Sequence, residues 1–179
     1  MLDQNKTQLM IIDVQGKLAQ LMHDKETLFS NLNTLTKAAK LMELPIVWVE
    51  QIPDKLGATI DEISQELPHQ RPIAKNVFSA WGEEAVRTAI ESHNRKQVLL
   101  VGIEAHICVH QTACELINAG YEVHLVTDAV SSRTQKNKEL ALKRLAQEGA
   151  ILTSTEMALF ELQRIAQGEQ FKALLKLIK

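Results

Sequence analysis

The sequence predicts an α/β domain in which a parallel sheet is covered by helices on both faces. Short aliphatic runs alternate with longer segments that carry apolar side chains at helical spacing. The short runs are apolar throughout, which is typical of strands buried on both faces. The 179 residues suffice for one substantial core, and no linker interrupts them, so we expect a single domain over residues 1–179.

The chain begins with a predicted strand at residues 9–14, an apolar run that closes on the carboxylate of Asp13. Apolar side chains then recur at helical spacing over residues 25–44, and the following proline ends this predicted helix. Residues 46–49 are β-branched or aromatic and form the second predicted strand.

Residues 51–73 interrupt the alternation, because they contain three prolines and a glycine and show little periodicity. We interpret them as a long excursion over the sheet, with one helical turn near residues 59–65. Long loops in compact domains often form lids or binding loops. Residues 73–75 at its end form a predicted short edge strand.

The second half of the chain returns to regular alternation. Gly120 and Gly149 lie just beyond two predicted helices, where a left-handed residue often stops a helix. The elements expected are helix 83–92, strand 97–101, helix 107–119, strand 122–127, helix 137–147, strand 150–153, a helix capped by Ser154 or Thr155, and a tail helix over 170–179. The capped helix is expected to bury Met157, Leu159, Leu162 and Ile165.

Reactive side chains follow the predicted strands. Asp13, Glu50 and Asp128 end or follow three of them, and Cys108 follows the strand at 97–101 through a turn. Carboxyl ends of parallel strands share one edge of a sheet, where ligands bind. Cys108 also lies near a helix start, where free N–H groups and the helix dipole favour an anion and should ease ionisation of a thiol. We therefore expect Cys108 to be a nucleophile.

A nucleophilic thiol needs a proton acceptor and a cation. Asp13 is the best acceptor, because an unpaired carboxylate after an apolar strand would be costly. Lys75 is the best cation, at the end of the long excursion. Spacing alone does not show that the three meet. Taken singly, Cys108 could be a small core residue, Asp13 a turn former and Lys75 a surface lysine.

Other site chemistries have less support in the sequence. His106 and His110 flank Cys108 as alternative bases, but neither has a second partner that would suggest a cysteine–histidine dyad. No metal-ligand spacing and no glycine-rich phosphate loop occurs, so we expect neither a metal nor another cofactor.

Composition limits the classes of binding partner and the cellular compartment that we expect. A net charge of −2 with dispersed basic residues, and only 4% aromatics, argues against a nucleic-acid platform. No apolar run approaches the roughly 20 residues that span a bilayer. Cys108 and Cys114 are too differently oriented on one helix to bridge, and the polar N-terminus does not look like a signal peptide. We expect a cytoplasmic protein that acts on a small molecule and binds neither nucleic acid nor membrane.

Four segments resemble one enzyme family. They are MIIDVQ at residues 10–15, EQIPDKLG at 50–57, AKNVFSAW at 74–81, and VGIEAHICVHQTACELINAGYEVHLVTDAVSSR at 101–133. Together they make the chain similar to the isochorismatase-like cysteine hydrolases over nearly its whole length. The similarity is strongest to the short, single-domain isochorismatase-domain hydrolases.

The resemblance implies a fold and a site. It implies a three-layer, doubly wound sheet of about six parallel strands, with the Lys75 strand at one edge. It implies a catalytic triad of Asp13, Lys75 and Cys108. It also implies a cis peptide at Ile103–Glu104, an oxyanion hole formed by the backbone N–H groups of Glu104 and Cys108, and a homo-oligomer, either a dimer or a larger assembly.

Two departures from relatives within this family indicate the chemistry. Nicotinamidases carry histidines for a metal after the second strand, whereas this chain has Glu50-Gln51-Ile52-Pro53, which argues against a metal and against nicotinamide. Isochorismate hydrolases commonly lack the cysteine, so Cys108 favours acyl transfer from an amide-like carbonyl through a thioester. The alternatives are vinyl-ether hydrolysis of the isochorismate type and a non-catalytic binding protein on the same fold.

Four side chains are predicted to line the substrate pocket. They are Gln51, Phe78, Trp81 and His106. Phe78 and Trp81 could equally be core residues.

Overall fold

A six-stranded parallel sheet forms the centre of the molecule. The computed structural model describes residues 1–178, so Lys179, the last residue of the predicted tail helix, lies outside the described residues. The strand order is β3-β2-β1-β4-β5-β6, and every neighbouring pair is parallel. The strands are β1 (Thr7–Ile12), β2 (Ile46–Gln51), β3 (Ile73–Lys75), β4 (Gln97–Ile103), β5 (Glu122–Ser131) and β6 (Ile151–Thr153). The predicted sheet is confirmed, with the Lys75 strand at one edge.

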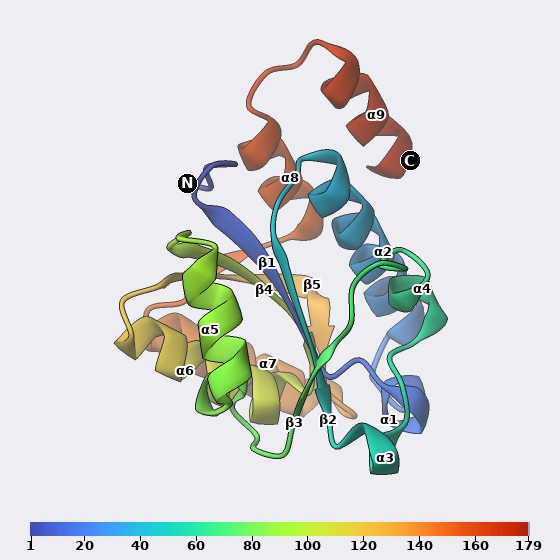
Figure 1. Ribbon diagram of the computed structural model, residues 1–179, viewed down its shortest axis with the longest axis vertical. Coiled ribbons are helices and arrows are strands. Elements are labelled where there is room, and N and C mark those ends of the chain that lie inside the picture. The colour runs from blue at the N-terminus through green and yellow to red at the C-terminus, as the bar shows by residue number, and fades with distance from the viewer. Residues whose placement is uncertain (179) are drawn as a thin grey trace.

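Helices cover both faces of this sheet, as Figure 1 shows. They are α1 (Gly16–Gln20), α2 (Lys25–Leu41), α3 (Pro53–Leu56), α4 (Asp61–Ser64), α5 (Glu84–Ser92), α6 (His110–Asn118), α7 (Gln135–Gln147), α8 (Thr155–Gln163) and α9 (Glu169–Ile178), with a 3-10 turn η1 (Ala80–Gly82) and a π-helical turn η2 (Ala105–Val109). Helices α2, α8 and α9 pack on one face, and α5, α6 and α7 on the other. The doubly wound, three-layer arrangement is therefore confirmed.

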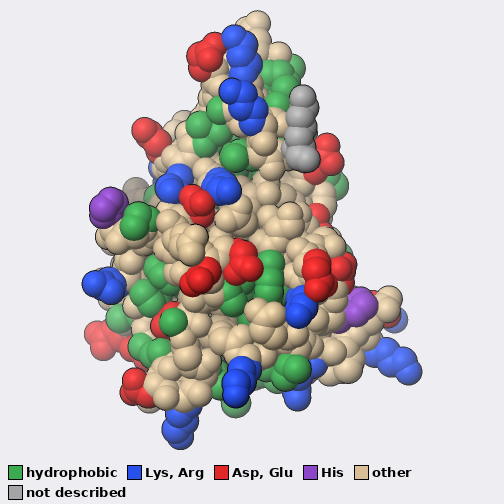
Figure 2. Space-filling view, turned by 90° about the vertical axis from the view of Figure 1, so that its right-hand side faces the viewer, with side chains coloured by type: hydrophobic (Ala, Val, Ile, Leu, Met, Phe, Trp, Pro, Cys, Tyr) green, Lys and Arg blue, Asp and Glu red, His purple; other side chains and the backbone are tan. Residues whose placement is uncertain are grey.

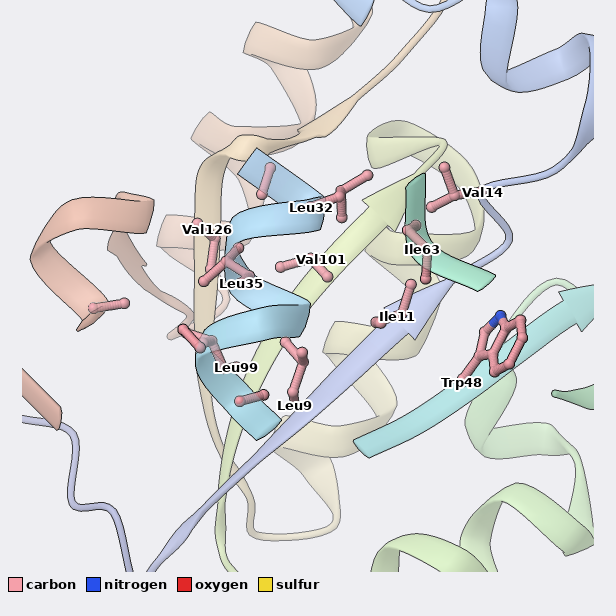
Figure 3. Packing of buried hydrophobic residues seen from close by; sticks show 14 of the residues in the cluster. Leu9, Ile11, Val14, Leu32, Leu35, Trp48, Ile63, Leu99, Val101 and Val126 are labelled. Carbon is pink, nitrogen blue, oxygen red and sulfur yellow. The ribbon is translucent and has the colours of Figure 1, made fainter. Parts of the chain in front are cut away.

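The buried apolar residues of the strands contribute to two apolar cores, one on each face of the sheet. Leu9 and Ile11 of β1 point toward Leu32 and Leu35 of α2 (Figure 3), whereas the alternate residue Met10 belongs to the core on the opposite face. This follows from the two-residue side-chain period of a strand. Continuous apolar runs such as Leu9–Ile12 thus serve both layers.

Several predicted boundaries are wrong. Two short helices, α1 and α3, lie beside the carboxyl ends of β1 and β2 and are not predicted from the sequence. Strand β5 continues beyond the predicted end, so Asp128 lies inside it, where its Oδ1 accepts hydrogen bonds from the backbone N–H and hydroxyl of Thr155 at 2.8 and 2.9 Å. In α8, Leu159 and Leu162 are buried as expected, but Met157 is exposed, and Ile165 is also exposed because it lies beyond the end of the helix at Gln163.

None of the helices described within residues 1–178 combines the length and the apolar character needed to cross a bilayer. Acidic and basic side chains are interspersed on the face in Figure 2.

Gly102 allows β4 to approach β1 directly below the candidate site. It pairs with Ile12, the residue before Asp13, and has a φ of +118°. A Cβ atom there would lie 2.1 Å from the carbonyl oxygen and 2.7 Å from the amide nitrogen of Ile12. Only glycine fits this close approach, which brings the ends of β1 and β4 together.

We expect Gly102→Ala to destabilise the fold by about 3 kcal/mol or more, because the methyl group meets backbone that cannot move aside. Urea denaturation followed by circular dichroism measures this loss. Gly120→Ala is the matched control, since Gly120 also has a positive φ, +82°, but no atom within 4 Å of the added Cβ. Its cost should be about 1 kcal/mol, and equal costs for both variants would contradict the close-approach argument.

Candidate active site

Three neighbouring strands bring the first polar groups of the site together. Asp13 follows β1, Gln51 ends β2 and Lys75 ends β3. The register pairs Gln51 with Lys75, and the backbone N–H of Asp13 donates to the carbonyl of Val49 in β2 at 3.2 Å. The edge predicted from the strand ends therefore exists, and parallel topology alone accounts for this meeting.

Lys75 is the most completely enclosed charge in this cluster, with a side chain that has no exposed surface. Its Nζ donates to Oδ2 of Asp13 at 2.6 Å and to Oε1 of Gln51 at 2.5 Å. It also reaches the carbonyl oxygens of Val77 and Phe78, each at 3.1 Å. A buried ammonium is tolerated only with such partners, so Lys75 is not the surface lysine of the alternative interpretation.

Asp13 is the counterion of Lys75, and it is 3% exposed. It adopts a left-handed conformation with a φ of +52°, which aspartate tolerates better than most residues. Its Oδ1 is buried and has no partner of ordinary hydrogen-bond geometry among residues 1–178. Burial raises the pKa of the Asp13 carboxyl, and the charge of Lys75 together with hydrogen bonding to Lys75 and Cys108 opposes this rise. Asp13 is therefore a carboxylate of increased basicity.

Cys108 completes the cluster from the π-helical turn η2, and it is 8% exposed. Burial, followed by the negative charge of Asp13, raises the pKa of the thiol to about 12, although the Lys75 charge opposes this effect. The expectation that the helix start eases ionisation is therefore wrong, because desolvation and a neighbouring carboxylate outweigh the dipole. The resting pair is a thiol and a carboxylate.

Gln15 and Gln51 hold the carboxyl end of β2 in place. Oε1 of Gln15 accepts from the backbone N–H of Gln51 at 2.6 Å, and its Nε2 donates to the carbonyls of Gln51 and Gly57 at 3.1 and 2.7 Å. Gln51 was predicted to bind substrate. In the structure its side-chain oxygen accepts from the Lys75 ammonium and so helps to position it. Its side-chain Nε2 has no protein acceptor in the described chain. Gln15 was not predicted, although a polar residue two positions after Asp13, at the end of an apolar strand, could have drawn attention to it.

The long excursion is fixed over the sheet by a second buried carboxylate. Oε1 of Glu50 accepts from the backbone N–H and the hydroxyl of Thr59, both at 2.7 Å. The indole Nε1 of Trp48 donates to the same hydroxyl at 2.8 Å. These bonds indicate that Glu50 holds the loop in place and is not a reactive group of the site.

The turn between β4 and Cys108 presents backbone donors beside the thiol. The Ile103–Glu104 peptide is cis, at the position implied by the family resemblance. The carbonyl of Glu104 accepts from the N–H groups of Ile107 and Val109, at 3.0 and 3.2 Å. Within residues 1–178, the N–H of Glu104 has no acceptor, and that of Cys108 has none outside its own helical segment.

The other predicted pocket residues lie in three different environments. Phe78 is 58% exposed and adjoins the Lys75 ammonium through its carbonyl. Trp81 instead packs edge-on against Tyr121, with ring centroids 5.5 Å apart, near the amino end of β5. Trp81 was predicted to line a pocket at Cys108. This prediction is wrong, because the ring packs near the amino ends of the strands, whereas Cys108 follows their carboxyl ends.

His106 is held by the loop after β5. Its Nδ1 lies 2.9 Å from Oγ of Ser132, and its Nε2 lies 3.4 Å from the amide nitrogen of Asn137. Because that amide nitrogen only donates, Nε2 accepts and Nδ1–H donates to Ser132. Both ring nitrogens are occupied, so the structure favours neither the predicted substrate contact nor a role as the alternative base. His110 likewise lies against Cys114, 3.9 Å away, and not against Cys108.

Among residues 1–178, no group of three or more His, Cys, Asp or Glu side chains is placed to bind a metal ion together. Cys108 and Cys114 are both free thiols.

Comparison with known proteins identifies a matching family and several similar proteins. The isochorismatase domain family matches residues 7–157. A "Secreted isochorismatase effector Isc1" of Phytophthora sojae is 42% identical, over 96% of this chain and 83% of that protein. The solved structure of "MAR1 Ribonuclease from Caenorhabditis elegans" superposes with a TM-score of 0.92 at 33% identity, covering 99% and 91% of the two chains. The YcaC gene product of Escherichia coli, described as "an octameric hydrolase of unknown specificity", has a TM-score of 0.92 at 25% identity, covering 98% and 89%.

The raised pKa of the Cys108 thiol predicts its ionisation state and the direction in which each neighbouring charge shifts that pKa. In a Cys114→Ser background, ultraviolet thiolate absorbance should be absent at about pH 8, since a pKa of about 12 leaves only about one Cys108 thiol in 10,000 ionised. Asp13→Asn removes a negative charge and should lower the pKa of Cys108. Lys75→Met removes a positive charge and should raise it.

A thiolate already present in the otherwise unmodified site near neutral pH would contradict this electrostatic description. So would shifts of the same sign in the Asp13 and Lys75 variants.

Proposed function

This chain belongs to the isochorismatase family, and we propose that it is a cysteine-dependent hydrolase that cleaves the C–N bond of a small amide-like substrate. The observation that carries the proposal is the meeting of a thiol, a carboxylate of raised pKa and a buried ammonium at one sheet edge. The family supports a hydrolase, and these three residues support a cysteine mechanism rather than a binding role.

In the first step, Cys108 Sγ attacks the carbonyl carbon while its proton passes to Asp13. Because the resting thiol has a pKa of about 12, attack and proton transfer are coupled rather than sequential. The raised pKa of Asp13 suits this role, since a more basic carboxylate is a better proton acceptor.

The tetrahedral intermediate then loses its amine. The backbone N–H groups of Glu104 and Cys108 stabilise the oxyanion. Protonated Asp13 returns its proton to the departing nitrogen as the C–N bond breaks, which leaves an acyl thioester on Cys108. A water molecule gives a proton to Asp13 as it attacks the thioester. The carboxylic acid product leaves, and the proton returns to Sγ.

Lys75 supports these steps without entering them. Its charge opposes the effect of burial on the pKa of Asp13 and favours the ionised carboxylate before Asp13 accepts a proton from Cys108 or from water. Its bond to Gln51 fixes the ammonium in position.

The enclosure of the thiol limits the substrate. Cys108 is 8% exposed, so only a small electrophile reaches Sγ. The free amide nitrogen of Gln51 and the exposed ring of Phe78 are the proposed pocket contacts. No cofactor takes part in this mechanism.

Vinyl-ether hydrolysis is the second candidate, because the Phytophthora sojae relative is named an isochorismatase effector. Protonation of a vinyl ether followed by addition of water uses Asp13 but needs no thiol. The two candidates therefore differ in their dependence on Cys108.

Assembly and compartment are proposed on narrower grounds. The octameric state named for the Escherichia coli structure supports a homo-oligomer here. Two free cysteines suit a reducing compartment, which supports action in the cytoplasm.

Activity should depend on all three residues. On a panel of small amides, ureas and carbamoyl compounds scored by ammonia release, Cys108→Ala should abolish turnover. Asp13→Asn and Lys75→Met should lower kcat/KM by at least about 100-fold. Cys114→Ala is the matched control and should retain activity, because Cys114 lies outside the cluster.

Isochorismate is included in the same panel. Its hydrolysis at an undiminished rate by Cys108→Ala, with no ammonia released from any amide, would reject the thioester mechanism in favour of vinyl-ether chemistry.

A further inference from the structure

A pocket lies at the opposite end of the strands from the cluster around Cys108. It has a volume of about 360 Å³ and lies near the carboxyl ends of α5 and α6, where β4 and β5 begin. This volume is at the lower end of the range of small-molecule sites, about 300–1,000 Å³. Its lining takes no part in the proposed reaction. It includes an aromatic pair, Trp81 and Tyr121, and three charged side chains, Glu91, Arg95 and Lys96.

Tyr121 forms the enclosed wall of this pocket. It is 7% exposed, and its ring meets that of Trp81 edge-on with centroids 5.5 Å apart. Its hydroxyl has no hydrogen-bond partner within residues 1–178, yet it is not one of the fully enclosed polar atoms. Burial, followed by the negative charge of Glu91, raises the pKa of this hydroxyl, so it stays protonated near neutral pH. A side chain that is more than nine-tenths buried therefore presents a free donor to the pocket.

The three charged side chains of the pocket are free to pair with a bound molecule. Among residues 1–178, no ion pair includes the Glu91 carboxylate, the Arg95 guanidinium or the Lys96 ammonium. The Lys96 ammonium lies over the ring of Tyr121, 4.2 Å from its centroid. The Arg95 guanidinium bonds through Nη1 alone, which donates to two backbone carbonyls near the amino terminus at 2.6 and 2.9 Å. The pocket thus offers both signs of charge beside an aromatic wall.

We propose that this pocket binds a free α-amino acid with an aromatic side chain. Such a molecule carries a carboxylate and an ammonium on one carbon, so it matches both signs of charge. Its carboxylate pairs with Lys96 and accepts from the hydroxyl of Tyr121. Its ammonium pairs with Glu91, and its ring packs against Trp81. A simple anion would leave Glu91 without a partner, and a simple cation would be repelled by Lys96 and Arg95.

NMR spectroscopy of the indole N–H groups tests this site without any turnover. The chain has two tryptophans. Trp81 lines the pocket, whereas Trp48 belongs to the core on the other face of the sheet, where its Nε1 donates to Thr59 at 2.8 Å. Trp48 is therefore the internal reference, and Trp81→Phe identifies the two signals. The probes are L-phenylalanine, 3-phenylpropionate, which lacks the ammonium, and 2-phenylethylamine, which lacks the carboxylate.

We expect L-phenylalanine to shift the Trp81 signal and not the Trp48 signal. Its Kd should be at least about tenfold lower than that of either other probe, because each of those lacks one charged contact. Glu91→Gln should weaken the binding of L-phenylalanine at least about tenfold but should not weaken that of 3-phenylpropionate. Lys96→Gln should weaken the binding of both probes, since both carry the carboxylate.

Glu156→Gln on α8 and Lys143→Gln on α7 are the matched controls, because they remove the same charges at exposed positions outside the pocket. Both should leave the Kd of L-phenylalanine unchanged. Cys108→Ala should also leave it unchanged, since Cys108 lies at the other end of the strands.

A Trp81 signal that L-phenylalanine does not shift, or equal Kd values for the three probes, would overturn the assignment. So would a Kd for L-phenylalanine in Glu91→Gln and Lys96→Gln that matches the control variants. The side chains of Glu91 and Lys96 are exposed, so thermal unfolding of both variants should match that of the parent. If either variant fails to fold, the comparison of the three probes on the unmodified protein decides alone.

Discussion

The buried ammonium of Lys75 is the group on which the site depends. A lysine without exposed surface must find its acceptors inside the protein, and here four oxygens from three segments supply them. Satisfying that one charge fixes the ends of β1 and β2 and the loop after β3. The sheet brings these segments to one edge, and Lys75 sets their mutual distances.

The same pair influences the protonation state of Cys108, the proposed nucleophile. Burial and the Asp13 charge favour the neutral thiol, and Lys75 only partly offsets them. A carboxylate made more basic by burial next to a thiol that resists ionisation is suited to moving one proton during attack. In the proposed mechanism, the thiol therefore loses its proton only as it attacks a substrate bound beside the backbone donors of the turn.

The sequence predicted what strand ends and periodicity can report. Asp13, Lys75 and Cys108 were found because each interrupts or follows an apolar segment at the carboxyl edge of a parallel sheet. Trp81 was misplaced, because an aromatic residue close in sequence to Lys75 gives no sign of which end of the strands it reaches. Gln15 was not predicted as a supporting contact, since side-chain bonds between distant segments have no local signature. The sign of the Cys108 pKa shift also required the structure, because burial competes there with the helix dipole.

The central claim is that Asp13 and Lys75 act as one charge-balanced unit, and a double-mutant cycle on the free energy of unfolding tests it most directly. Each single change, Asp13→Asn or Lys75→Met, leaves the other charge buried without its counterion and should cost about 3 kcal/mol. The double variant removes both charges, so it should be no less stable than either single variant, which corresponds to a coupling energy of about 3 kcal/mol. Single costs that add in the double variant to within about 0.5 kcal/mol would show that the two residues do not form such a unit.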